Sequence, residues 1–343
     1  MATIDIFNND AFSTTSLVAA IEKVPFLPQY LSDLEIFEDD PVRTESVWVE
    51  ERDGQLTLIK TSKRGAPLPQ RTTEKRTARG FKTTRIAKGD RLMAAELQGI
   101  RAFGSETELM AVQTEVARRL AGPTGLMREV QLTWENMRLG AVQGIVVDAD
   151  SSPIINWFDE FGIAQPAEIG LDIAAIATGS LRKTLAKEIV RPMTRAAKGL
   201  LLPTSQIYAL CGDDFFDDLT SHDDVRQTYL NWQAATELRT GTAFSAFRFG
   251  GISWINYRGT DDNSTVAVPV DDAKFFFRGA PGLFRQAWSP AEFFGFINTP
   301  GLPVYPKIVL DDDREAYVDI EVYSYPMFIC TRPGTLFRAR AGA

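Results

Sequence analysis

Hydrophobic and polar residues alternate in two stretches of the chain, one near residue 50 and one near residue 320. Residues 47–59 hold two alternating runs separated by Asp53 and Gly54, a dipeptide typical of a two-residue β-hairpin turn. Residues 317–325 alternate without interruption, which predicts a long strand with one buried face. We therefore expect β-strands both early and late in the chain.

Apolar residues recur every three or four positions in three other segments, which predicts helices. These segments are 105–120, 126–143 and 171–200, the last of them bent near Pro192. The first two are separated only by the short sequence GPTG at 122–125. Together they predict a long, interrupted, amphipathic rod.

Shorter apolar runs predict further strands, and Asp213 and Asp214 stand where the first turn of a helix favours carboxylates. The predicted strands are 144–148, 154–158, 206–211, 247–249, 252–257 and 274–277. We expect residues 83–86 to return as a strand and residues 279–306 to be rich in loops. This mixed order of helices and strands indicates an α+β fold.

Composition limits the class of protein. The chain has 343 residues, of which 44% are apolar and 24% charged, enough to build a large core in one or two domains. We find no apolar stretch near the ~20 residues that span a bilayer, and no signal peptide at the N-terminus. We therefore expect no membrane association.

The charge is distributed very unevenly. Residues 60–91 contain eleven Lys or Arg and two acids, Glu74 and Asp90, a net charge of +9. Because the whole chain has a net charge of −8, the remaining residues carry −17. A basic segment with so few apolar residues needs a partner outside its own core.

Candidate catalytic chemistry is weak. A single histidine, His222, argues against His-based triads and multi-His metal sites, and its acidic surroundings predict a surface position. Cys211 and Cys330 lie in apolar runs and are expected to be buried and reduced. We predict no catalytic residue, no cofactor and no metal site.

Paired aspartates recur along the second half of the chain and are the one feature that would suit a carboxylate-dependent hydrolase. Neighbouring aspartates point in different directions, however, so a solvated acidic surface is the favoured interpretation. The pairs are Asp213/Asp214, Asp217/Asp218, Asp223/Asp224, Asp261/Asp262, Asp271/Asp272 and the run Asp311, Asp312 and Asp313.

Three partners suit the basic segment: solvent around a linker, nucleic acid, or another copy of the chain. Lysine and arginine suit phosphates, but only Phe81 supplies the aromatic ring on which single-stranded bases stack. The acidic remainder also repels a polyanion. Taken as one out-and-back excursion, residues 46–92 reach about 50–70 Å when extended, well beyond a body whose radius of gyration is ~19 Å.

Six short sequences, in this order and spacing, resemble a known family. They are VWVE with DG (47–54), TSKRGAP (61–67), ELQGIRAFG (96–104), ENMRLGAVQG (135–144), NTPGLP (298–303) and YSYPMFICTRP (323–333). The chain resembles the phage-lambda type of major capsid protein of tailed bacteriophages, which has the Hong Kong 97 fold. The resemblance covers nearly the whole chain.

The resemblance implies a domain organisation. Residues 1–45 are expected to form an N-terminal arm and 46–92 an extended loop, the E-loop. Residues 93–165 would form the peripheral P-domain with its spine helix, and 166–300 an α/β axial A-domain. Residues 301–343 would supply the return strand of the P-domain and a C-terminal tail.

The resemblance also implies a function. The chain would be a structural protein, not an enzyme, whose copies form pentamers and hexamers of an icosahedral shell around double-stranded DNA. The implied partners are a separate scaffolding protein, a portal and a decoration protein, with DNA contacted weakly and non-specifically. The protein would reside in the virion after assembly in the host cytoplasm.

On this interpretation the basic segment contacts a neighbouring copy. The predicted contact residues are Lys60, Lys63, Arg64, Arg71, Lys75, Arg76, Arg79, Lys82 and Arg85. The acids at 35–40, with Glu106, Glu108 and Glu115, are candidate receivers. A nucleic-acid-binding module that uses residues 60–91 is the alternative, and a carboxylate hydrolase is the third hypothesis.

Overall fold

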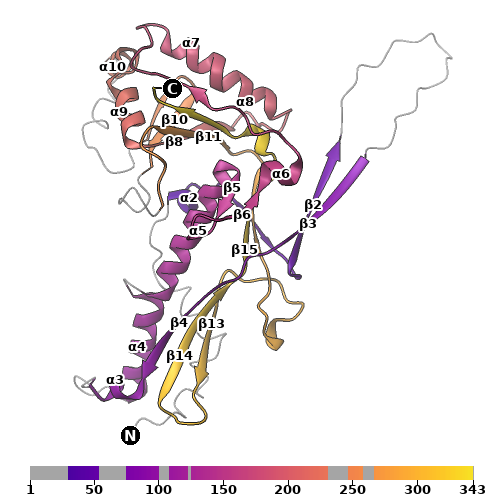
Figure 1. Cartoon of the computed structure of the whole chain (residues 1–343), viewed down its shortest axis with the longest axis vertical. Coiled ribbons are helices and arrows are strands. Elements are labelled where there is room, and N and C mark those ends of the chain that lie inside the picture. The colour runs from indigo at the N-terminus through magenta and orange to yellow at the C-terminus, as the bar shows by residue number, and fades with distance from the viewer. Residues whose placement is uncertain are drawn as a thin grey trace, which may run out of the picture.

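The chain is built as a sheet-and-helix domain, a long helical rod with a second sheet, and a projecting hairpin (Figure 1). The structure, a computed structural model, describes residues 30–53, 75–99, 108–122, 125–230, 246–257 and 266–342. Across these ranges, no helix combines the length and the apolar character needed to cross a membrane.

A mixed six-stranded sheet forms the first domain, in the order β7-β16-β11-β8-β10-β9. Its strands are β7 (Ile169–Gly170), β8 (Gln206–Cys211), β9 (Ala246–Phe249), β10 (Ile252–Asn256), β11 (Asp272–Arg278) and β16 (Phe337–Arg340). Every residue of β10 is buried, as are all but one each in β8 and β11. The central strands are therefore covered on both faces.

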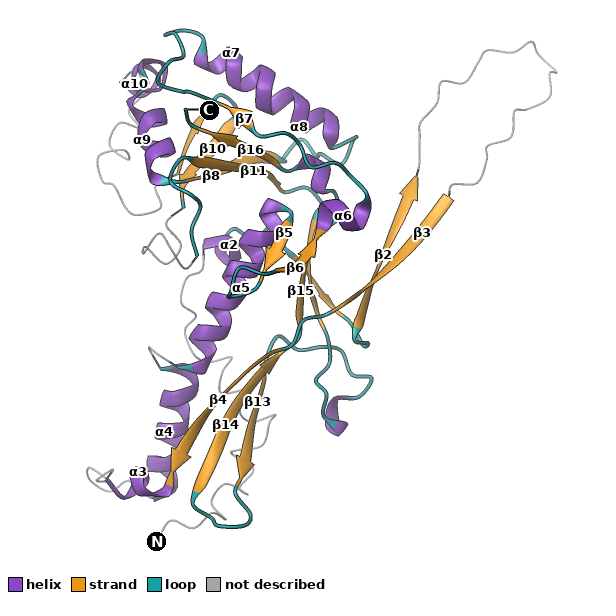
Figure 2. Cartoon of the chain, in the orientation of Figure 1, coloured by secondary structure: helices purple, strands orange, loops and turns teal. Residues whose placement is uncertain are grey.

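Helices flank this sheet (Figure 2). They are α7 (Leu181–Leu185), the π-helical turn η3 (Ala186–Val190), α8 (Arg191–Ala196), α9 (Asp213–Ser221) and α10 (Asp223–Leu230). The predicted helix over 171–200 begins only at Leu181, because Gly179 adopts a left-handed φ of 87° just before it. Near Pro192, where the sequence predicts a bend, the π-helical turn gives way to α8, and the proline stands in the first turn of that helix.

The rod consists of α4 (Glu108–Ala121) and α5 (Leu126–Gln143), preceded by α3 (Ala94–Gly99). It runs beside a three-stranded antiparallel sheet of β13 (Tyr305–Leu310), β14 (Tyr317–Ser324) and β4 (Ile86–Met93). The predicted long strand is confirmed as β14, and its residues alternate between buried and half-exposed. The predicted interruption at 122–125 separates the two helices.

A second three-stranded sheet, β1-β12-β15, joins the two halves of the molecule. It contains β1 (Glu38–Pro41), β12 (Phe284–Trp288) and β15 (Pro326–Cys330), and α2 (Tyr30–Asp33) precedes it. The hairpin β5 (Ile145–Val147) and β6 (Pro153–Asn156) leads into α6 (Trp157–Phe161). Short 3-10 turns, η4 (Phe294–Phe296) and η5 (Pro333–Thr335), complete the described elements.

One sequence prediction is wrong in this region, and another is incomplete. Residues 83–85 are not in a strand but link two strands, β3 (Lys75–Lys82) and β4. Residues 279–306 are mostly loops and turns, as predicted, but they also contain β12 and the start of β13. Arg285 and Gln286 are half-exposed and interrupt the apolar pattern of β12, so the sequence alone does not mark it as a strand.

Candidate functional site

A two-stranded hairpin projects from the body, away from the α4–α5 rod (Figure 2). Strand β2 (Ser46–Asp53) pairs antiparallel with β3 along its whole length, from Ser46 opposite Lys82 to Asp53 opposite Lys75. The strand predicted from residue 47 is confirmed and pairs with β3; the second predicted run, residues 55–59, lies outside the described residues. The predicted turn at Gly54 lies outside the described residues.

The base of this hairpin is fixed to the body by apolar contacts. Val47, Val49 and Phe81 are buried. The Phe81 ring meets Trp157 edge-on at a centroid distance of 5.1 Å and Phe161 at 6.2 Å, both on α6. Because aromatic pairs in this geometry add about 0.5–1.5 kcal/mol beyond area burial, α6 fixes the direction of the hairpin.

The outer face of the hairpin presents one large aromatic side chain. Trp48 lies between two buried valines in sequence but is 64% exposed. Its ring covers Gly80 on the paired strand, where an added Cβ would stand 3.3 Å from the ring. The absence of a side chain at Gly80 thus lets the indole lie across β3 with its other face in solvent.

The predicted contact residues fall into three groups. Lys60, Lys63, Arg64 and Arg71 lie outside the described residues. Lys75, Arg76, Arg79 and Lys82 lie on β3, the returning strand of the hairpin. The guanidinium carbon of Arg79 lies 5.6 Å from the Phe161 ring centroid.

Arg85 lies off the hairpin, between β3 and β4, and has partners within its own chain. Its guanidinium donates to Glu292 at 3.2 Å and lies 5.2 Å from the Tyr323 ring centroid. Hydrogen bonding to Glu292 raises the pKa of Arg85 despite the opposing effect of burial. The position of Arg85 suits the bracing of the hairpin base better than a reach to another molecule.

The acids near residue 38, which we considered as receivers of the basic segment, are also largely engaged within the chain. Glu38 accepts from the Gly282 amide at 2.7 Å, and Asp39 accepts from the Trp288 indole at 2.9 Å. Asp40 pairs with Arg285. These contacts attach the N-terminal segment to β12.

Glu115, another candidate receiver, binds two arginines of its own helix. Arg118 and Arg119 donate to its carboxylate at 2.6–2.8 Å. The hydrogen bonds from Arg118 and then Arg119 lower the pKa of Glu115 to about 2, against the effect of burial. Of the other helix acids, Glu106 lies outside the described residues.

A buried polar network joins α2, α5, β12 and Tyr257, the residue that follows β10. Glu135 accepts from the Leu31 amide at 2.9 Å and from the Tyr257 hydroxyl at 3.0 Å through the same oxygen. Arg138 lies 3.9 Å from the other oxygen and donates to Gln286 at 3.2 Å. Burial raises the pKa of Glu135, the direction expected of a carboxylate removed from water.

The single histidine is buried, contrary to the surface position we predicted. His222 is 9% exposed. Its Nδ1 accepts from the Asp224 amide at 3.1 Å, so its Nε2 carries the proton and donates to the Ile176 carbonyl at 2.9 Å. The ring therefore joins two loops and has no free nitrogen for catalysis.

Several of the paired aspartates also have structural roles, so the prediction of a solvated acidic surface is only partly right. Asp272 is 2% exposed and pairs with Lys274 at 2.7 Å and Arg340 at 2.9 Å. The Asp224 carboxylate accepts from the Leu181 amide at 3.1 Å at the start of α7. Within the described ranges, no group of three potential ligand side chains is arranged to hold a metal ion.

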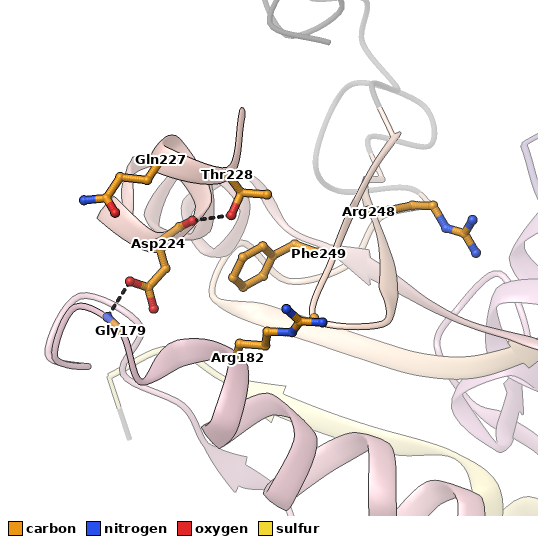
Figure 3. A pocket seen from close by; sticks show the side chains of 8 residues that line it. Gly179, Arg182, Asp224, Gln227, Thr228, Arg248 and Phe249 are labelled. Atoms are coloured by element: carbon orange, nitrogen blue, oxygen red, sulfur yellow. Dashed lines mark hydrogen bonds between the residues drawn. The ribbon is translucent and has the colours of Figure 1, made fainter. Parts of the chain in front are cut away.

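An open depression of about 500 Å³ lies beside α7 and α10 (Figure 3). Its described lining includes Arg182, Asp224, Gln227, Thr228 and Arg248. The carboxylate of Asp224 is engaged by backbone amides. The described lining therefore contains no nucleophile paired with a general base, and the projecting hairpin remains the strongest candidate for function.

The chain is similar to phage major capsid proteins. The family model described as "Phage major capsid protein E" matches residues 13–341. The major capsid protein of Salmonella phage Felix O1 is 24% identical over 362 residues, covering 97% of each chain. That of Pseudomonas phage KPP10 is 25% identical over 340 residues, covering 93% of each.

Solved structures show the same fold. A chain of the mature capsid of bacteriophage PhiM1 superposes with a TM-score of 0.51 at 11% identity, covering 93% of this chain and 88% of that one. A capsid chain of an empty GTA particle gives a TM-score of 0.51 at 11% identity, covering 94% of each.

Proposed function

The chain belongs to the phage major capsid protein E family, and from that membership we propose how its copies join to form a shell. As a major capsid protein it is a structural component of the virion, not an enzyme, and it assembles with copies of itself. We propose that these copies form pentamers and hexamers that close an icosahedral shell around double-stranded DNA.

The observation that carries the proposed contact is the exposed indole of Trp48 on a hairpin held at its base. Aromatic side chains are enriched among the residues that dominate protein–protein interfaces. Trp48 is 64% exposed while Val47 and Val49, on either side of it, are buried. The hairpin is thus oriented by its own chain but leaves its largest apolar surface for another.

The basic residues supply the second half of the contact. Lys60, Lys63, Arg64, Arg71, Lys75, Arg76, Arg79 and Lys82 are proposed to pair with acids on the neighbouring copy. Opposite charge at an interface speeds encounter and fixes register, whereas the buried aromatic adds affinity. Since such pairs are screened by salt, assembly should slow as ionic strength rises.

Further partners follow from the family as proposals. A separate scaffolding protein would set the size of the shell, a portal would occupy one vertex and a decoration protein would bind the outside. Assembly would take place in the host cytoplasm. DNA would be contacted weakly, because the body carries most of the negative charge of the chain.

The test compares Trp48→Ala with Leu202→Ala, a control at a residue 49% exposed on the six-stranded-sheet domain. Assembly is followed by sedimentation and negative-stain microscopy over a range of protein concentrations. Trp48→Ala should raise the concentration needed for shells at least tenfold, equivalent to about 1.4 kcal/mol per contact, and the control should not. Wild-type protein that stays monomeric at every concentration and salt, with or without scaffold, would sink the proposal.

Charge reversal separates self-association from nucleic-acid binding. Lys82→Glu on the hairpin is compared with Lys183→Glu, an exposed lysine on α7. We expect the first to impair assembly and the second to leave it close to wild type. Tight, steeply salt-dependent DNA binding that only Lys82→Glu weakens, with assembly intact, would favour the nucleic-acid-binding alternative instead.

A further inference from the structure

The loop between β12 and β13 carries the most exposed large hydrophobic side chain of the described chain. Phe294 is 96% exposed, and Ile297, one helical turn further on, is 57% exposed. A single exposed apolar side chain needs no explanation, but two large ones close together on the same turn form a patch. We call Phe294 and Ile297 the apolar knob.

The exposure of this knob is built into the loop. Phe293 packs edge-on against Tyr323 at a centroid distance of 5.0 Å, and Phe296 packs against Tyr305 at 4.9 Å. These anchors flank Phe294 in η4, so the turn buries its neighbours and leaves it in solvent. The loop is therefore preorganised for a partner, which lowers the entropic cost of binding.

Hydrogen bonds hold the rest of the loop in place. The Gly301 amide donates to the Val42 carbonyl at 2.8 Å, and the Leu302 amide donates to the Tyr305 hydroxyl at 2.7 Å. That hydroxyl in turn donates to the Ser289 carbonyl at 3.0 Å. The knob thus stands on a fixed base rather than on a free tail.

Basic side chains outnumber acidic ones near the knob. Arg43 donates to the Asn298 carbonyl at 3.3 Å, Lys307 lies 4.3 Å from the Phe293 ring centroid, and Arg85 pairs with Glu292. Three cations therefore stand near the knob with two acids, Glu292 paired with Arg85 and Glu321 opposite Lys307 on β14. A surface that fits it needs an apolar contact with an acidic border.

The chain has such a surface at the turn between β13 and β14. Asp312, Asp313 and Glu315 are exposed there. Met93, opposite Tyr317 on the neighbouring strand, is 43% exposed at the same end of the sheet. This acidic end, defined by these four residues, complements the knob in both charge and apolar character.

The knob and the acidic end cannot meet within one chain. The loop precedes β13 and the turn follows it, so this strand of six residues separates the end of the loop from the start of the turn by about 17 Å at ~3.4 Å per residue. In Figure 1 the loop with its short helical turn lies to the side of β13, whereas the β13–β14 turn lies beyond the far end of that strand. Any contact between them must join two copies.

We propose that the apolar knob of one copy docks on the acidic end of β13–β14 of another copy. The inference rests on the proposed function, since it adds a second contact to a shell made of copies of this chain. Because the two surfaces differ, each copy offers its knob to one neighbour and its acidic end to another. Such a head-to-tail contact propagates from subunit to subunit.

The first experiment measures the accessibility of the knob. The native thiols are silent in this assay: Cys211 and Cys330 are buried, and burial raises the pKa of the Cys330 thiol to about 12. A Phe294→Cys variant should react with a maleimide at least tenfold more slowly in assembled shells than in free subunits. Leu202→Cys serves as the control for an exposed position elsewhere.

The second experiment identifies the receiving surface. The double variant Phe294→Cys/Asp312→Cys, oxidised within shells, should give a ladder of covalent multimers on a non-reducing gel, and dilute subunits should give none. Equal labelling of Phe294→Cys in shells and subunits would overturn the inference, and would leave the knob to a partner other than this chain. Protection without cross-linking would overturn the assignment of the acidic end. If shells form normally, either outcome leaves the proposed function standing. The proposed function itself fails only if no shells form.

Discussion

The two main sheets of the molecule bury their strands to different degrees. In the six-stranded sheet, β10 and most of β11 are buried on both faces. In the β13-β14-β4 sheet, β14 alternates between buried and half-exposed residues, and β4 has a single buried residue. The first sheet is completed by its own chain, whereas the second leaves one face available to other molecules.

This difference extends to the exposed apolar side chains. Trp48 lies on the hairpin whose strand β3 leads into the half-covered sheet, and Phe294 lies in the loop before β13 of that sheet. Trp254, in the six-stranded sheet, is completely buried. A subunit that folds alone but works only in contact with its copies needs both kinds of surface. Four substitutions distinguish side chains that stabilise the subunit from side chains that are left for contact with other copies.

The largest loss of stability is expected in the six-stranded sheet. Trp254 is fully buried, stacks on Phe215 at 6.2 Å between ring centroids and donates to the Phe249 carbonyl at 3.1 Å. Trp254→Ala should lower the free energy of unfolding of the free subunit by about 3–5 kcal/mol, measured by denaturant titration with circular dichroism. A loss below 1 kcal/mol would mean that Trp254 is not buried in this domain as described.

A smaller loss is expected on the buried face of β14. Ile320→Ala removes a fully buried side chain and should cost about 2–5 kcal/mol, less than Trp254→Ala because the opposite face of this sheet is already half-exposed. The adjacent outward-facing change Glu321→Gln should stay within about 0.5 kcal/mol. Similar losses for the two would erase the difference between the faces of β14.

Acid should loosen the attachment of the rod to this sheet. The folded pKa of Glu115, about 2, lies below its ordinary value of 4.5, so its stabilising effect is complete above pH 4.5 and is lost as the pH falls toward 2. Arg119 transmits this effect, since it also donates to the Arg91 carbonyl on β4 at 2.8 Å. Glu115→Gln should flatten the dependence of unfolding free energy on pH in that window, and an unchanged slope would contradict this.

The smallest effect on the free subunit is expected at Trp48. Because its indole is 64% exposed, Trp48→Ala should change the unfolding free energy by no more than about 0.5 kcal/mol. The same variant should impair assembly, as described above. A large loss of subunit stability would instead assign Trp48 to the fold of its own chain.

The sequence predicted the elements whose pattern is regular. The alternation of 317–325 and the spacing of 126–143 correspond closely to β14 and α5. Family membership confirms the resemblance found in the sequence, and with it the Hong Kong 97-type α+β fold and the role in the capsid. The domain boundaries and the contact residues remain predictions.

The elements that the sequence missed depend on partners far along the chain. Strand β12 accommodates a polar residue, Arg285, because that side chain pairs with Asp40, 245 positions away. His222 is buried because the Ile176 carbonyl, 46 positions away, accepts from its ring. Local spacing carries no information about such partners, and the exposure of Phe294 likewise depends on Tyr323 and Tyr305.

The two strands of the projecting hairpin continue into different sheets of the body. Strand β2 follows β1, and β3 is followed after three residues by β4, which pairs with β14 over all eight of its residues. A pull on the hairpin along β4 therefore acts on that whole ladder in shear, so its hydrogen bonds resist together rather than breaking one by one from an end. Tension transmitted through the hairpin would thus be divided between two anchors in every subunit.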